Sequence, residues 1–187
     1  AVRTLLYLSG SEDRAFVIRP SADLKLTICT DSNWDVRFSC CGGILHYGGA
    51  PFAWFAKTQR SVSLSSAEAE FFGAMLAARE GQFARELLVD LGRPPTGPTI
   101  IFTDSKSCVD LSIEAVAFKK TKHILRAAEY LRDLVLREVF TLKHIPGVDN
   151  PADVMTKALP RGTFLKVVDL IYSFKNRVSV PAVVDCR

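Results

Sequence analysis

Two aspartates in this sequence follow short β-prone runs. Asp31 follows the run 24–30 and Asp104 follows the run 99–103, and each is the middle residue of a Thr-Asp-Ser triplet. A single aspartate at such a position is commonly a turn or capping residue, because its carboxylate accepts backbone N–H groups. Two of them at the same end of neighbouring strands would instead lie within reach of one cation. The repeated triplet therefore predicts a shared divalent-metal site.

Two glutamates lie in the first turns of a predicted helix that begins after Ser65. Glu68, three residues after Ser65, is predicted to close a capping box and therefore to be structural. Glu70 lies about 200° around the helix from Glu68, towards the apolar face, so its carboxylate would point at the sheet and need a partner such as a metal. The alternative is a glutamate placed at the helix N-terminus by the helix dipole.

The segment 144–153 reads as a strand, a loop and a helix start, and it carries two further acids. Asp149 is turn-like and is interpreted as a cap for the helix that Pro151 opens. Asp153 lies on the first turn of that helix and is the fourth candidate metal ligand. Crowded carboxylates repel one another, so we expect at least one raised pKa in the absence of metal.

The predicted site consists of Asp31, Glu70, Asp104 and Asp153. Oxygen ligands of this kind suit Mg²⁺, with Mn²⁺ as a substitute. Two such ions about 3.5–4 Å apart activate a water and stabilise the leaving oxygen of a phosphoryl displacement. The predicted chemistry is therefore metal-dependent phosphodiester hydrolysis.

The elements that must position these acids follow from hydrophobic periodicity and turn signals. We expect strands at 24–30, 40–47, 52–57, 99–103 and 139–145, and helices at 65–91, 105–113, 121–137 and 151–159. A helix end at 1–8 and a short strand at 15–18 precede them, and Gly48-Gly49 predicts a hairpin turn. A crossover helix joins parallel strands, so this order makes the first and fourth strands natural neighbours.

Composition sets broad limits on function. With 187 residues, 48% of them hydrophobic and 24% charged, the chain is long enough for one main globular domain, and no apolar run approaches the roughly 20 residues of a membrane span. The five cysteines form no CxxC pair, which indicates neither a zinc site nor a disulfide framework but reduced thiols. A net charge of +4 permits contact with a polyanion. Because the chain starts at Ala1, we expect a piece of a polyprotein.

Five ordered motifs carry a family resemblance. They are TDSNW, KTQRSVSLSSAEAEFFGA, IFTDSKSCVDL, KKTKHI and HIPGVDNPADVMTKALP. Over residues 5–160 the chain resembles the ribonuclease H domain of copia-type retrotransposon polyproteins. The resemblance implies an α/β fold of the ribonuclease H type, with a five-stranded mixed sheet, the first three strands antiparallel, and helices on both faces. Carried over motif by motif, the family's metal ligands are again Asp31, Glu70, Asp104 and Asp153.

The resemblance also implies the activity and the partners. Members of this family bind two Mg²⁺ ions and cut the RNA strand of RNA–DNA hybrids, leaving 3′-hydroxyl and 5′-phosphate ends. Expected partners are the hybrid and the reverse transcriptase portion of the same polyprotein, with no membrane and no small-molecule cofactor. We expect an intracellular protein, in cytoplasmic retrotransposon particles or in the nucleus. Polymerase motifs are absent from the sequence, so no DNA synthesis is expected from this chain alone.

The expected domain organisation has three parts. Residues 1–20 resemble the tail of the preceding reverse transcriptase, 21–160 form the ribonuclease H-like domain, and 161–187 are a C-terminal extension. The sequence departs from the family in the loop before the last aspartate, where relatives have a histidine and this chain has Gly147, Val148 and Asp149. His144 lies earlier, on the strand, and receives no catalytic assignment. The stretch between Trp34 and Cys40 is also short for the family.

Candidate nucleic-acid contacts lie in two basic stretches. They are Lys57, Gln59, Arg60 and Ser63 before the first long helix, and Lys119, Lys120 and Lys122 before the second. Lysines could grip phosphates without reading sequence, although such runs are equally often solvated faces. Trp34 and Trp54 are predicted to pack in the core or on the sheet rather than to stack on bases. The alternative function is a catalytically inactive nucleic-acid-binding scaffold, or a degenerate or host-adopted copy; the intact acids favour the enzyme.

Overall fold

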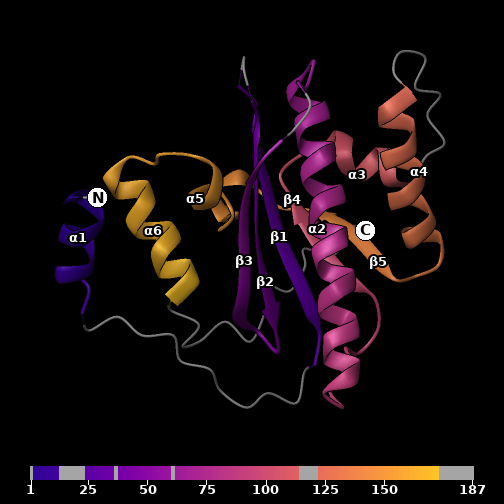
Figure 1. Cartoon of the computed structure of the whole chain (residues 1–187), viewed down its shortest axis with the longest axis horizontal. Coiled ribbons are helices and arrows are strands. Elements are labelled where there is room, and N and C mark those ends of the chain that lie inside the picture. The colour runs from indigo at the N-terminus through magenta and orange to yellow at the C-terminus, as the bar shows by residue number, and fades with distance from the viewer. Residues whose placement is uncertain (1, 13–23, 36–37, 60–61, 114–121, 173–187) are drawn as a thin grey trace.

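The computed structural model describes residues 2–12, 24–35, 38–59, 62–113 and 122–172 (Figure 1). The strands are β1 (Leu26–Asn33), β2 (Cys40–Tyr47), β3 (Ala50–Thr58), β4 (Thr99–Thr103) and β5 (Phe140–His144). The helices are α1 (Val2–Ser9), α2 (Ser66–Asp90), α3 (Lys106–Ile113), α4 (Lys122–Leu136), α5 (Asp153–Thr156) and α6 (Arg161–Tyr172), with a 3-10 turn η1 (Gly147–Asp149). The predicted order of strands and helices is confirmed from β1 to α5, whereas the strand expected at 15–18 lies outside the described residues.

The five strands form one mixed sheet in the order β3-β2-β1-β4-β5. β1, β2 and β3 pair antiparallel, and β4 lies parallel to both β1 and β5, as the resemblance implied. The hairpin between β2 and β3 turns at Gly48 and Gly49, whose φ angles of 57° and 82° are ones that glycine adopts without strain. In the parallel pair Cys29 lies opposite Phe102, so Asp31 and Asp104 each lie two residues further along their chains.

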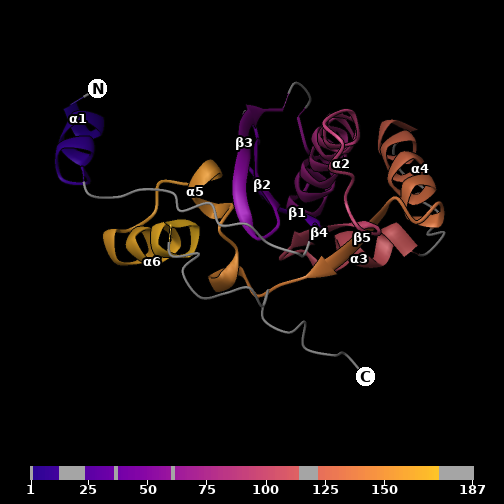
Figure 2. The ribbon, with the colours of Figure 1, turned by 90° about the horizontal axis from the view of Figure 1, so that it is seen from below.

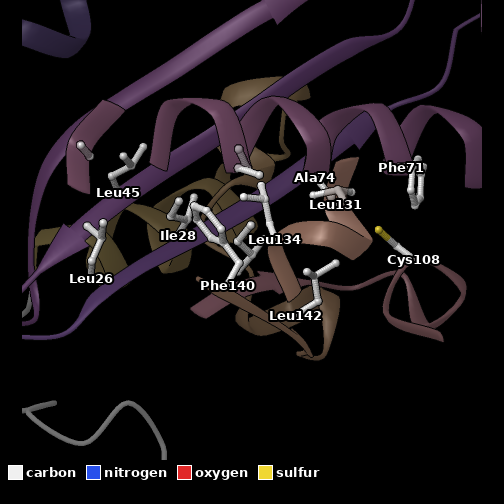
Figure 3. Close-up of a cluster of buried hydrophobic side chains, with 14 of the residues drawn as sticks. Leu26, Ile28, Leu45, Phe71, Ala74, Cys108, Leu131, Leu134, Phe140 and Leu142 are labelled. Atoms are coloured by element: carbon white, nitrogen blue, oxygen red, sulfur yellow. The ribbon is translucent and has the colours of Figure 1, made fainter. Parts of the chain in front are cut away.

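Helices cover both faces of the sheet, as expected (Figure 2). The main core lies between the sheet and α2, α3 and α4, where Ile28, Phe71, Leu131 and Phe140 are fully buried (Figure 3). On the opposite face Ile44 packs against Val167 and Ile171 of α6. Ile44 and its neighbour Leu45 belong to different faces because side chains alternate along a strand. The segment predicted as a C-terminal extension thus includes a helix that packs on the sheet.

One prediction about local structure was wrong. The helix expected at 151–159 has a single turn, Asp153–Thr156, and Lys157 is already extended, with φ −130° and ψ 146°. Pro160 disfavours a helical conformation at the residue before it, which limits any extension of this helix. Trp34 and Trp54 are 49% and 62% exposed, so neither is a core residue. Trp54 lies on the edge strand β3, which agrees with the predicted sheet packing, and Trp34 lies beyond the end of β1.

The described helices are short or polar relative to a membrane span. None of them combines the length and the apolar character that a bilayer crossing requires.

Candidate metal centre

Three carboxylates converge where β1 and β4 run side by side. Asp31 lies in β1, Asp104 directly follows β4, and Glu70 lies in the second turn of α2. One carboxylate oxygen from each residue lies within 4.8 Å of the other two. Asp31 lies inside β1 rather than at its end, because pairing with β2 continues to Asn33. The structure therefore brings together three of the four predicted ligands.

The N-terminus of α2 orients Glu70. Ser65 accepts a hydrogen bond from the backbone N–H of Glu68 (3.2 Å), and the Glu68 carboxylate accepts one from the backbone N–H of Leu64 (2.8 Å). Glu68 is buried and serves this cap, as predicted, although its carboxylate reaches Leu64 rather than Ser65. Glu70 is left to point at the sheet. Its Oε2 is buried and has no hydrogen-bond partner among the described residues.

Burial and, after it, the crowding of like charges raise the pKa values of carboxylates in the cluster. Burial, followed by the charges of Asp31 and Asp104, raises the pKa of Glu70 to about 8. Burial, followed by the charge of Asp31, also raises the pKa of Asp104. The expectation of a raised carboxylate pKa is thus confirmed. A buried, unpaired oxygen among oxygen-only donors fits a hard divalent cation such as Mg²⁺ or Mn²⁺.

Asp153 is linked to the cluster by Lys157, which forms ion pairs with both Asp31 and Asp153. The ammonium of Lys157 lies 3.1 Å from Oδ1 of Asp31 and 3.0 Å from Oδ1 of Asp153. Thr156 donates a hydrogen bond to the other oxygen of Asp31, so both oxygens of this fully buried carboxylate have partners. Burial lowers the pKa of Lys157, but Asp31 and Asp153 raise it, and the net direction is upward. Burial likewise raises the pKa of Asp153.

Sequence reasoning missed Thr156 and Lys157. The available signal was the spacing of Asp153 and Lys157, because oppositely charged residues four apart face each other on a helix. Their contact with Asp31, more than 120 residues earlier in the chain, has no local signature.

Buried contacts under α5 hold these residues in place. Asn150 is fully buried, donates to the backbone carbonyl of Thr30 (3.0 Å) and accepts from the backbone N–H of Ala152 (3.1 Å). Asn150 thereby ties the start of α5 to β1, one residue before Asp31. On β2, a Cβ atom at Gly42 would lie 2.5 Å from Cβ of Met155 and 2.9 Å from Cγ2 of Thr156. The absence of a side chain at Gly42 thus allows α5 to pack directly on the sheet.

We expect Gly42→Ala to displace α5 and to lower the free energy of unfolding by about 1–3 kcal/mol, the usual range for overpacking a close contact. The added methyl would meet Cβ of Met155 rather than the end of a flexible side chain, so the backbone of α5 must move. Urea unfolding checks the stability. The matched control is Gly162→Ala in α6, where an added Cβ meets nothing within 4 Å. Equal stability of the two variants would contradict the prediction.

The predicted nucleic-acid residues near α2 separate into two groups. Lys57 is exposed and forms an ion pair with Glu80 (2.5 Å). Gln59 and Ser63 are buried: Ser63 donates to the Gln59 side chain (2.6 Å), which in turn donates to the Ala69 carbonyl (3.0 Å). Buried side chains with internal partners do not reach a strand at the surface, so we assign Gln59 and Ser63 to the fold.

The remaining predicted contacts are not placed. Arg60, Lys119 and Lys120 lie outside the described residues, and for Lys122 only the backbone, at the start of α4, is described. His144 is exposed at the end of β5, and its Nε2 lies 3.1 Å from the backbone carbonyl of Asp104.

Comparisons with known proteins point to one group of mobile elements. The chain is 30% identical over 166 residues to the retrovirus-related Pol polyprotein from transposon RE2 of Arabidopsis thaliana, and 31% identical over 142 residues to that from transposon TNT 1-94 of Nicotiana tabacum. These matches cover 87% and 76% of this chain, respectively. The chain spans only 11% of the length of each polyprotein. No protein-family model matches the chain.

Among solved structures, LC11-RNase H1, isolated from compost, matches with a TM-score of 0.56 at 18% identity, covering 71% of this chain and 93% of that one. The N-terminal RNase H domain of Rv2228c from Mycobacterium tuberculosis matches with a TM-score of 0.53 at 15% identity, covering 81% and 96%. At these identities the likeness establishes the fold. The resemblance drawn from the motifs is thus confirmed: the chain is homologous to a segment of the retrovirus-related Pol polyproteins of plant transposons, and that segment has the ribonuclease H fold.

Proposed function

We propose that this chain hydrolyses the RNA strand of RNA–DNA hybrids during reverse transcription of a retrotransposon. The observation that carries the proposal is the convergence of Asp31, Glu70 and Asp104, with a buried oxygen of Glu70 left without a partner among the described residues. LC11-RNase H1, which shares the fold, has also been solved in complex with an RNA/DNA hybrid (TM-score 0.54, 16% identity). The Pol polyprotein relatives supply the context of reverse transcription.

The acidic residues would hold two Mg²⁺ ions, or Mn²⁺ in their place. When bound, such ions supply an activated water and stabilise charge at the phosphate under attack. Asp31, Glu70, Asp104 and Asp153 provide the oxygen ligands. Asp31 is kept in one orientation by the hydrogen bond from Thr156 and by its burial in the sheet. Oε2 of Glu70 is buried and has no hydrogen-bond partner among the described residues, so a cation bound there would offset the cost of burial.

Substrate selection would rest on shape and charge. A hybrid has a near-A-form minor groove with 2′-hydroxyls on one strand only, which distinguishes it from duplex DNA. Lys57, Lys119, Lys120 and Lys122 are proposed to contact phosphates, which adds affinity without reading sequence. We also propose that the chain acts inside the cell, next to the reverse transcriptase portion of its parent polyprotein, with no membrane and no small-molecule cofactor.

Replacing Lys119, Lys120 and Lys122 together by alanine should weaken hybrid binding and flatten its dependence on salt. Each lysine–phosphate pairing contributes about 0.7–0.9 to the slope of log K against log salt, so removing three of them would reduce the slope by about 2 or more. Fluorescence anisotropy between low and moderate salt measures the slope. Replacing the exposed Lys166 of α6 by alanine is the control. An unchanged slope in the triple variant would mean that these lysines do not contact phosphates and only form a solvated face of the protein.

The experiment that tests the function is cleavage of end-labelled substrates by the purified chain in Mg²⁺, in Mn²⁺ and in EDTA. The panel contains an RNA–DNA hybrid and, as controls, single-stranded RNA, duplex RNA and duplex DNA of the same sequence. We expect metal-dependent cutting of the hybrid's RNA strand alone, with 3′-hydroxyl and 5′-phosphate products. A folded protein that binds the hybrid without cutting it would instead support the inactive scaffold or degenerate copy.

A further inference from the structure

A positively charged side chain, that of Lys157, lies among the carboxylates of the acidic site. The Lys157 ammonium lies between Asp31 and Asp153, at 3.1 Å and 3.0 Å from one oxygen of each. The aspartates belong to different elements, β1 and α5, and these two ion pairs join them. The ammonium therefore neutralises the side of the cluster that faces Asp153, whereas Glu70 on the other side keeps a buried oxygen with no hydrogen-bond partner among the described residues.

Asp31 takes part both in the three-carboxylate cluster and in the ion pairs of Lys157. It is one of the three carboxylates whose oxygens lie within 4.8 Å of one another, and it is also the carboxylate bound by Lys157. A metal ion placed between Asp31 and Asp153 would meet the Lys157 ammonium at close range, where the two cations repel each other. A cation that binds Asp31 and Asp153 together must displace Lys157.

The two partners differ in their freedom to move. The Asp31 side chain is fully buried, whereas the Lys157 side chain is 36% exposed and follows the end of α5, where the backbone is already extended. A four-carbon stem with an exposed head can rotate towards solvent without moving the sheet. Displacement of Lys157 is therefore compatible with the fold, whereas displacement of Asp31 is not.

We propose that Lys157 is a tethered competitor for the second metal ion. One ion binds Asp31, Glu70 and Asp104 with the lysine in place, and a second ion, held by Asp31 and Asp153, binds only when the ammonium leaves. This inference rests on the proposed metal-dependent function. It adds that the two ions bind in a fixed order and that the first binds more tightly than the second. It assigns Lys157 a role in regulating the second ion rather than in holding substrate.

The test is Mn²⁺ binding to the purified chain without nucleic acid, measured by calorimetry and by the electron paramagnetic resonance signal of free Mn²⁺. Wild type should bind one ion more tightly than the second. Lys157→Met should bind the second ion about 10-fold more tightly or better, since a unit charge within about 4–6 Å changes the proton affinity of a carboxylate by roughly 10- to 1000-fold. Lys157→Arg, which keeps the charge, and Lys166→Met, which removes an exposed charge on α6, should behave like wild type.

The direction in which Mn²⁺ affinity changes when Lys157 is replaced distinguishes a lysine that competes with the second ion from one that only supports the two aspartates. If Lys157 were only a structural prop for Asp31 and Asp153, its removal would weaken Mn²⁺ binding, and that result, or equal affinities, would overturn the inference while leaving the metal site intact. Absence of Mn²⁺ binding in wild type and variant alike would overturn the metal-dependent function as well. Circular dichroism verifies folding, and Lys157→Gln, which keeps a neutral donor, repeats the test if the methionine variant unfolds.

Discussion

Asp104→Asn is expected to reduce cleavage of the RNA strand by more than about 100-fold while leaving the protein folded and able to bind the hybrid. Changes to residues behind metal ligands already cost about 10- to 100-fold, and Asp104 is a predicted ligand itself. Asparagine has nearly the same shape but no charge, and the charge at this position is unfavourable in the metal-free protein, since burial and Asp31 raise the pKa of Asp104. The loss should therefore fall on metal binding and catalysis rather than on folding.

Single-turnover cleavage with saturating protein measures this effect apart from product release. The matched control is Asp149→Asn, which makes the same chemical change at an exposed residue of η1 that does not belong to the three-carboxylate cluster. Near-wild-type cleavage by Asp104→Asn, in a protein whose hybrid affinity is unchanged, would exclude Asp104 from the site. It would also remove the main support for a metal shared by Asp31 of β1 and Asp104, which follows β4.

The metal-free protein is expected to lose stability as the pH rises from about 5 to above 8, and Glu70→Gln should remove a large part of this dependence. The pKa of Glu70 in the folded protein is about 8, against an ordinary value of 4.5, so the folded state holds this proton more tightly than the unfolded state does. The stabilisation is fully present below the ordinary value and is lost as the pH rises through about 8. Asp104 and Asp153, whose pKa values are also raised, act in the same direction.

Urea unfolding in the presence of EDTA at pH 5, 6.5 and 8 measures this slope. Glu86→Gln, at an exposed position of the same helix, is the control and should leave the slope unchanged. Mg²⁺ should oppose the loss, because a metal ion stabilises the ionised carboxylate, and its affinity should increase as the pH approaches 8. A pH slope of wild type that matches that of Glu70→Gln would contradict the raised pKa of Glu70 and with it the burial of this carboxylate beside Asp31 and Asp104.

Much of the site followed from local sequence rules. Asp31 and Asp104 were paired because each follows a β-prone run in the same triplet, and the order of elements made their strands neighbours, as the parallel register of β1 and β4 confirms. Glu68 and Glu70 were separated by helix geometry, since Ser65 and Glu68 form a cap and Glu70 then faces the sheet. These inferences succeed because capping, strand alternation and crossover connections depend on a few residues at fixed spacing.

The placement of Lys157, Gln59 and Trp54 could not be obtained in that way. Lys157 is near Asp153 by helix spacing, but its contact with Asp31 exists only because α5 packs on β2 over Gly42. Gln59 looks like a loop residue in sequence, yet it is buried by contacts with β2 and α2. Trp54 was predicted to pack in the core or on the sheet, and only the position of β3 at the edge of the sheet decides between the two. Burial and long-range ion pairs depend on which elements pack together, and residue type and spacing do not contain that information.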